Sequence, residues 1–141
     1  MALTPSVRCH AISDDIGSEV LDAVELGAPV PGEIQVRLKA CAVNFPDILM
    51  IQGKYQLKPP LPFAPGGEAA GDVVAVGAGV SEREVGEAVV LGLRYGGFSE
   101  VINVPAAAAR PIPGAMSYAK AAAFQTAYLT AYVALVPRGR S

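Results

Sequence analysis

The sequence predicts a mainly β fold, with about seven short strands arranged as a barrel or a sandwich. Three observations favour this fold class. Fifteen glycines and twelve prolines are spread along the 141 residues, so the chain is interrupted too often for many long helices. Hydrophobic residues make up 52% of the chain and charged residues 17%, which supplies enough apolar material for a core. Residues 33–43 alternate strictly between apolar and polar side chains, which is typical of a strand with one buried face.

The expected strands follow from short apolar runs between turn residues. A first strand is expected over 7–12 and a second over 19–26, followed by the alternating strand over 33–43. Runs of valine and leucine bounded by glycines then predict strands over 71–77, 87–93 and 97–104. The alanine-rich stretches 106–109 and 121–123 are expected to serve packing.

A short helix is expected after Asn44. Pro46 is tolerated in a first helical turn, and Asp47 adds a negative charge that the helix dipole favours. Gly53 is expected to end this helix, and four prolines make 58–65 a stiff, extended connector.

Two further helices are expected near the C-terminus. Ser117 can cap a helix that runs through residue 123. Residues 128–136 are expected to form the second, which Pro137 and Gly139 would stop.

Charge and composition argue against several classes of function. The net charge is -2, and no basic stretch favours nucleic acid. No apolar run approaches the ~20 residues of a membrane helix, and residues 1–10 lack the layout of a signal peptide, so a cytoplasmic protein is expected. Cys9 and Cys41 lie far apart, and His10 is the only histidine, which leaves no four-cysteine zinc lobe or multi-histidine site.

Several short segments carry a resemblance to a known family. They are AVNFPD at 42–47, GKY at 53–55, LPFAPGGEAAGDV at 61–73, AAAF at 121–124 and TAY at 130–132. In this order, and over nearly the whole chain, they resemble the medium-chain dehydrogenase/reductase superfamily, and in particular its zinc-free quinone oxidoreductase branch.

The resemblance implies a two-part protein. A GroES-like, partly open β-barrel with a few short helices is expected over 1–123, as the substrate-binding and catalytic domain. Residues 124–141 would form a helix leading toward a Rossmann nucleotide-binding domain, whose glycine-rich segment does not follow Thr130 in this sequence. The tail 136–141 also resembles the remnant of a thrombin site, with natural sequence as the alternative. The chain alone is expected to be catalytically inactive.

The same resemblance implies that zinc is absent. The three ligand positions of the zinc-containing alcohol dehydrogenases correspond to Asn44, Gly67 and Thr126. An amide, a glycine and a hydroxyl cannot replace thiolate and imidazole as zinc ligands. Without a Lewis acid, the expected acceptor is a quinone or a conjugated carbonyl, because it spreads the developing charge.

The candidate site residues come from the resemblance as well. Asn44 and Tyr55 are expected to donate hydrogen bonds, either to the substrate oxygen or, as the resemblance favours, to the cofactor. Thr130 matches a threonine beside the nicotinamide, and NADPH is the expected cofactor. Asp47 is the second catalytic candidate, with a helix-start charge as the alternative role. Glu68 is expected to be structural.

The predicted activity is that of an NADPH-dependent quinone reductase, acting as a homodimer when full length. Two alternatives remain open: an enoyl-thioester or alkenal reductase, and a non-catalytic binding member of the same superfamily.

Overall fold

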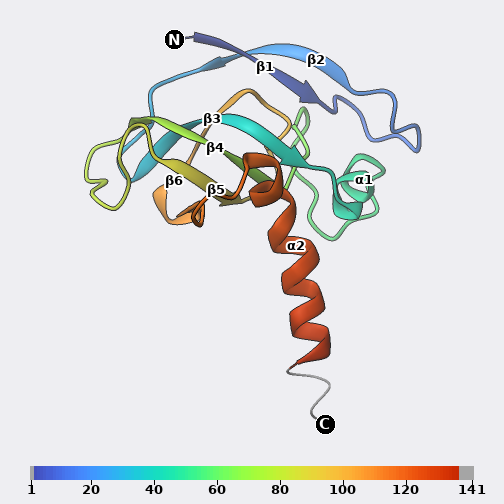
Figure 1. Cartoon of the computed structure of the whole chain (residues 1–141). Helices are drawn as coiled ribbons and strands as arrows, with labels where there is room; N and C mark the ends of the chain where they lie inside the picture. Colours follow the sequence, from blue (N-terminus) through green and yellow to red (C-terminus); the bar gives the residue numbers. More distant parts are fainter. Residues whose placement is uncertain (1, 137–141) are drawn as a thin grey trace.

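Residues 2–136, which the computed structural model describes, form seven strands, two α-helices and one 3-10 turn (Figure 1). The strands are β1 (Ala2–Arg8), β2 (Val20–Leu26), β3 (Glu33–Ala42), β4 (Glu68–Val76), β5 (Ala88–Gly92), β6 (Val101–Pro105) and β7 (Ala109–Pro111). The helices are α1 (Phe45–Ile51) and α2 (Tyr118–Leu135), and the 3-10 turn η1 spans Ala106–Ala108.

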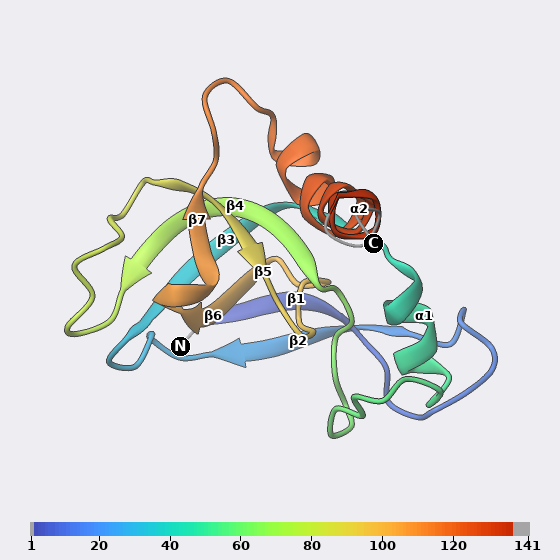
Figure 2. The same ribbon diagram turned by 90° about the horizontal axis from the view of Figure 1, so that it is seen from below.

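The strands form two antiparallel sheets that do not close on each other. β1 and β2 pair as a two-stranded ribbon, and the larger sheet has the order β6-β3-β4-β5-β7. The loop before β6 joins them, because Phe98 O accepts from Val7 N at 2.8 Å and Glu100 O accepts from Leu38 N at 2.8 Å. Figure 2 shows the larger sheet curving above the ribbon. The predicted mainly β, partly open architecture is therefore confirmed.

The main core lies on one face of the larger sheet and confirms the alternation predicted for β3 as far as Leu38; beyond the register shift between Leu38 and Ala40 the alternation is interrupted, and Ala40 packs against a different cluster from Leu38. Ile34 and Val36 are fully buried, whereas Arg37 and Lys39 are exposed. The buried cluster comprises Ile34, Val36, Val73, Val89, Leu91, Val104, Ala106 and Ala109. Ala106 and Ala109 thus have the packing role expected of the alanine-rich stretch.

Gly71 allows β3 and β4 to approach closely. A Cβ placed on Gly71 would lie 2.0 Å from the carbonyl oxygen of Arg37. The β3–β4 register shifts between Leu38 and Ala40, next to this contact. Only a residue without a side chain fits this position, because an added methyl would meet backbone atoms that cannot move independently.

The short helix α1 forms where the sequence predicts it. Asn44 is its N-cap, in an extended conformation, and Pro46 sits in the first turn. Gly53 follows the helix with a φ of +68°, a conformation that glycine adopts without strain.

The first strand was predicted wrongly. The expected range was 7–12, but β1 spans Ala2–Arg8, and beyond it Cys9 forms only an isolated bridge with Phe63. Pro5 lies within this strand. Its missing N–H is not needed here, because Pro5 contributes its carbonyl oxygen, which accepts from Glu100 N at 2.9 Å.

The C-terminal helical region was also predicted wrongly in one respect. The two expected helices, 117–123 and 128–136, are one continuous helix, α2. The reason is that residues 124–127 contain neither glycine nor proline to interrupt it. The expected cap is present, since Ser117 Oγ accepts from Lys120 N at 3.2 Å.

Helix α2 packs on the sheet only through its first turns. Ala121 and Ala122 are buried against Ala70 of β4, and the rest of the helix extends away from the barrel (Figure 1). The final residues, 137–141, which carry the resemblance to a thrombin site, lie outside the described residues. Within the described part of the chain, no helix has the length and apolar character needed to cross a bilayer.

Candidate functional site

A cavity of about 680 Å³ opens where the end of β3, helix α1, the start of β4 and helix α2 meet. These elements are far apart in the sequence, and the pairing of β3 with β4 brings them together. The cavity is lined by Asn44, Pro46, Asp47, Met50, Tyr55, Gln56, Leu57, Gly67, Leu93, Arg94 and Thr126. Three of the predicted residues, Asn44, Asp47 and Tyr55, therefore share one cavity.

The Asn44 side chain is held by a buried carboxylate. Asn44 Nδ2 donates to Glu68 Oε2 at 2.8 Å, and the backbone N–H of Thr126 donates to Glu68 Oε1. Glu68 is only 4% exposed. These internal hydrogen bonds agree with the structural role expected for Glu68, and both of its partners line the cavity.

Asp47 is buried and bonded on both carboxylate oxygens. It is 2% exposed, and it accepts from Asn44 N at 2.8 Å and from Gly66 N at 3.0 Å. The first bond satisfies a backbone group at the helix start, as the alternative role of a helix-start charge requires. The second ties α1 to the turn before β4. Any catalytic role for Asp47 would have to act through these backbone contacts.

Tyr55 and its neighbours form the apolar wall of the cavity. Tyr55 and Leu57 pack against the small cluster of Cys9, Met50, Ile51 and Phe63. This packing holds the Tyr55 ring at the edge of the cavity. Among residues 2–136, no hydrogen bond to the Tyr55 hydroxyl is present, so this donor is free to meet a ligand.

Thr130 does not share the cavity with the other predicted residues. Thr126 lines the cavity, whereas Thr130 lies one turn further along α2, on an exposed part of the helix. The structure therefore brings together Asn44, Asp47 and Tyr55 and leaves Thr130 outside.

The three positions that correspond to zinc ligands do lie on one cavity. Asn44, Gly67 and Thr126 all line it. Asn44 offers an amide that is already bonded to Glu68, Gly67 offers no side chain, and Thr126 offers a hydroxyl. These groups do not match the thiolate and imidazole ligands of zinc. Within residues 2–136, no three His, Cys, Asp or Glu side chains are grouped closely enough to hold a metal ion.

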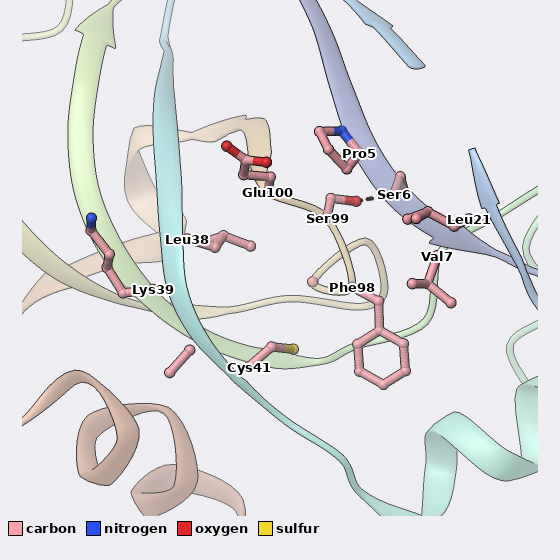
Figure 3. Close-up of a pocket in the computed structure, with 12 residues that line it drawn as sticks. Pro5, Ser6, Val7, Leu21, Leu38, Lys39, Cys41, Phe98, Ser99 and Glu100 are labelled. Carbon is pink, nitrogen blue, oxygen red and sulfur yellow. Dashed lines mark hydrogen bonds between the residues drawn. The ribbon is translucent and has the colours of Figure 1, made fainter. Parts of the chain in front are cut away.

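A second cavity of about 320 Å³ lies between β1 and β3 (Figure 3). Its lining includes Cys41 and Phe98, and Ser6 Oγ lies 2.8 Å from Ser99 Oγ at its edge. Burial raises the pKa of the Cys41 thiol to about 12, and the carboxylates of Asp47 and Glu68 add to this effect. The thiol is therefore protonated at neutral pH and is a poor nucleophile.

Sequence reasoning missed several residues of the main cavity. Met50 faces it from α1, and Leu93 and Arg94 reach it from the segment after β5. Met50 could have been found from helical spacing, because it lies four residues after Pro46 on the same face. Leu93 and Arg94 carry no such signal, since only the β4–β5 pairing brings them near Gly67; Leu93 N donates to Gly67 O at 2.8 Å.

Residues 30–114 match the alcohol dehydrogenase GroES-like domain, and the chain belongs to this family of medium-chain dehydrogenases/reductases. It is 46% identical over 112 residues to the human synaptic vesicle membrane protein VAT-1 homolog, covering 79% of this chain and 28% of that protein. It is 36% identical over 134 residues to a quinone oxidoreductase of Lama guanicoe, covering 92% of this chain and 41% of that protein. The chain thus spans well under half the length of these relatives.

Solved structures agree with this assignment. The human VAT-1 homolog-like protein superimposes with a TM-score of 0.90 at 32% identity, over 99% of this chain and 45% of that one. Escherichia coli quinone oxidoreductase complexed with NADPH gives 0.81 at 37% identity, over 95% and 41%. CurK enoyl reductase gives 0.81 at 25% identity, over 93% and 42%. The predicted GroES-like domain and the oxidoreductase family are confirmed.

Proposed function

We propose that this chain is the substrate-binding part of an NADPH-dependent, zinc-independent oxidoreductase that reduces a quinone or a conjugated carbonyl. The observation that carries the proposal is one cavity that Asn44 and Tyr55 both line, together with a donor set unsuited to zinc. The likeness to quinone oxidoreductases, one of them complexed with NADPH, supports it.

The residues of the cavity suit a dinucleotide headgroup and a flat acceptor. Asn44 and Tyr55 offer an amide and a free hydroxyl, which can bond to ribose hydroxyls or a carboxamide. Met50, Leu57 and Leu93 supply apolar surface against which a planar ring can pack. When bound, NADPH supplies a hydride. Thr130 is proposed to contact the cofactor from the exposed part of α2.

The proposed class of acceptor follows from the hydrogen-bond donors that the cavity offers. A simple ketone develops a localised alkoxide charge that calls for strong electrostatic stabilisation. A quinone or enone spreads the charge, so that hydrogen bonds from Asn44 and Tyr55 suffice, and solvent protonates the product. Asp47 is proposed to act indirectly, by holding the backbone of Asn44 at the cavity.

An enoyl-thioester reductase is the second candidate. The likeness to CurK enoyl reductase favours it, at 25% identity and a TM-score of 0.81. The reaction again reduces a conjugated carbonyl compound, and the same cavity residues would serve. A non-catalytic binding protein is the third candidate, and the two human VAT-1-type relatives are the reason to test it.

The test uses the whole protein, including the nucleotide-binding domain that we expect to accompany this chain. It is mixed with NADPH and 9,10-phenanthrenequinone, and the absorbance of the reduced nicotinamide is followed. We expect oxidation with the quinone. Oxidation only with an enoyl thioester would favour the second candidate, and no oxidation with either acceptor would favour the third.

A pair of hydroxyl deletions locates the site. Tyr55→Phe should raise the KM for NADPH by about 2- to 10-fold, as expected for one lost hydrogen bond. Tyr118→Phe is the matched control, because its hydroxyl bonds to Asp72 instead. Equal kinetics for Tyr55→Phe and the wild type would remove Tyr55 from the proposed site.

Three further properties belong to the same proposal. Elemental analysis of the purified protein should find no stoichiometric zinc. Sedimentation should give a homodimer, as the family resemblance implies. Fractionation of cells should find the protein in the cytoplasm.

A further inference from the structure

Glu68 is a buried carboxylate that joins three separate segments of the chain. It begins β4, its Oε2 atom accepts from the side chain of Asn44 at the end of β3, and its Oε1 atom accepts from the backbone of Thr126 in α2. Each oxygen thus holds a different element. Burying a carboxylate is unfavourable unless hydrogen bonds replace its contacts with water. Both contacts therefore stabilise Glu68 in its buried position.

The carboxylate fixes which way the Asn44 amide points. A carboxylate offers only acceptors, so the amide can meet it only with its NH₂ group. Turning the amide over would place Asn44 Oδ1 against Glu68 Oε2, two acceptors in contact. The orientation therefore follows from hydrogen-bonding chemistry, and it leaves one N–H of the Asn44 amide for other partners.

The second oxygen links this orientation to α2. Thr126 follows the buried residues Ala121 and Ala122 along α2, and the later part of this helix extends away from the barrel (Figure 1). A displacement of the helix at Thr126 would pull on Glu68 and, through it, on Asn44. Within the described residues, Glu68 is the charged side chain that bonds to the side-chain amide of Asn44, whereas Asp47 bonds to its backbone N–H.

We propose that Glu68 is a positioning residue, which orients the Asn44 amide for ligand binding and couples that orientation to helix α2. This inference rests on the proposed function only for the identity of the ligand. It assigns Glu68 no contact with substrate or cofactor, and its effect on binding passes through Asn44.

The first test does not depend on NADPH. ¹⁵N spectra of the 141-residue chain are recorded for the wild type, Glu68→Gln and Glu100→Gln. Glutamine has one acceptor oxygen where glutamate has two, so it cannot serve both donors. We expect Glu68→Gln to shift the side-chain NH₂ signals of Asn44 and the amide signal of Thr126. Glu100 is an exposed carboxylate paired with Arg37, and its variant should shift neither signal.

The second test is a double-mutant cycle on NADPH affinity in the whole protein. Glu68→Gln should weaken binding by about 2- to 10-fold when Asn44 is present, the range for one perturbed hydrogen bond. In an Asn44→Ala background it should have no further effect, because the residue through which it acts is gone. A merely structural role would weaken binding by the same factor in both backgrounds.

The outcomes separate the two proposals. A folded Glu68→Gln chain with unmoved Asn44 signals, or an additive cycle, would overturn the positioning role. If the wild-type protein does not bind NADPH, the proposed function fails, and the spectra alone decide the role of Glu68. A Glu68→Asp variant that restores part of the affinity would support the role, because it returns two acceptor oxygens.

Discussion

Asp47 and Gly66 are joined by a buried hydrogen bond, in which Gly66 N donates to Asp47 Oδ1 at 3.0 Å. The other oxygen of Asp47 accepts from Asn44 N. One carboxylate thus fixes the end of β3, the start of α1 and the turn before β4. The shape of the cavity depends on this arrangement, because Asn44 and Gly67 lie on the segments that it holds.

Asp47→Asn should therefore lower the stability of the fold. One of its two acceptor oxygens becomes an NH₂ group that faces a backbone N–H, and we expect the free energy of unfolding to fall by about 1–3 kcal/mol. Urea unfolding followed by circular dichroism measures this, with Glu100→Gln as the exposed control. Unchanged stability together with lost activity would instead support the catalytic role predicted for Asp47.

Gly71→Ala should disrupt the central sheet. The new methyl would meet the Arg37 carbonyl oxygen, and backbone atoms cannot relieve such overpacking locally, so we expect a loss of at least about 3 kcal/mol or no folded protein. Gly92→Ala is the matched control in β5, where the nearest atom is the flexible end of Gln125 at 3.6 Å. Both variants are compared by urea unfolding, and similar stabilities would contradict the close approach of β3 and β4.

The Cys41 thiol should react slowly in the folded chain. Because burial raises its pKa to about 12, the thiolate fraction at pH 8 is far below that of an exposed cysteine. Alkylation by iodoacetamide, located by peptide mass spectrometry, should be on the order of 100-fold slower than in the urea-unfolded chain. The rate should rise steeply as the pH approaches the raised pKa. Equal rates in the folded and unfolded chains at pH 8 would refute the effect of burial.

Asp22 should make the β1–β2 ribbon sensitive to acid. Arg8, at 2.7 Å, and His10, at 2.6 Å, hold the pKa of Asp22 below its ordinary value of 3.8. A lowered pKa in the folded state contributes stability that is present above pH 3.8 and lost as the pH falls through the lowered pKa. Asp22→Asn should thus be less stable than the wild type at pH 7, and the difference should shrink at low pH.

Denaturation at pH 7 and at pH 3 measures this difference. Asp14→Asn is the control, because Asp14 forms a highly exposed pair with Lys54 whose contribution is expected to be small. A difference between Asp22→Asn and the wild type that stays constant across the pH range would contradict the linkage.

Local patterns were sufficient to predict most of the fold. The alternation from Ile34 onward identified β3, and Pro46 with Gly53 bracketed α1, because each signal acts over a few residues. The errors occurred where the secondary structure of a segment depends on pairing with residues that are distant in the sequence. β1 exists because β2 and the loop at Glu100 pair with it, and no pattern within residues 2–8 announces that pairing.

The sequence predicted several residues of the site but not the hydrogen bonds between them. Asn44 and Tyr55 came from the family resemblance, and they do share a cavity. The bond from Asn44 to Glu68 could not be predicted, because it depends on the register between β3 and β4, in which Ala42 pairs with Glu68. The pairing of β4 with β5, in which Glu68 pairs with Gly92, places Arg94 at the cavity, and no local sequence signal indicates this.

Helix α2 is held to the sheet only near its N-terminal end. Its buried apolar contacts are the methyl groups of Ala121 and Ala122, beside the hydrogen bonds of Tyr118 to Asp72 and of Thr126 to Glu68, and the helix runs on for thirteen residues beyond Ala122 to Leu135, about 20 Å at the usual rise per residue. A slightly larger side chain at either alanine would tilt the helix axis at its base. The same tilt would displace the residues further along the helix, including Thr130, by a larger distance than the base. The direction of the whole helix thus depends on a few contacts at its base, two of which come from alanine methyl groups.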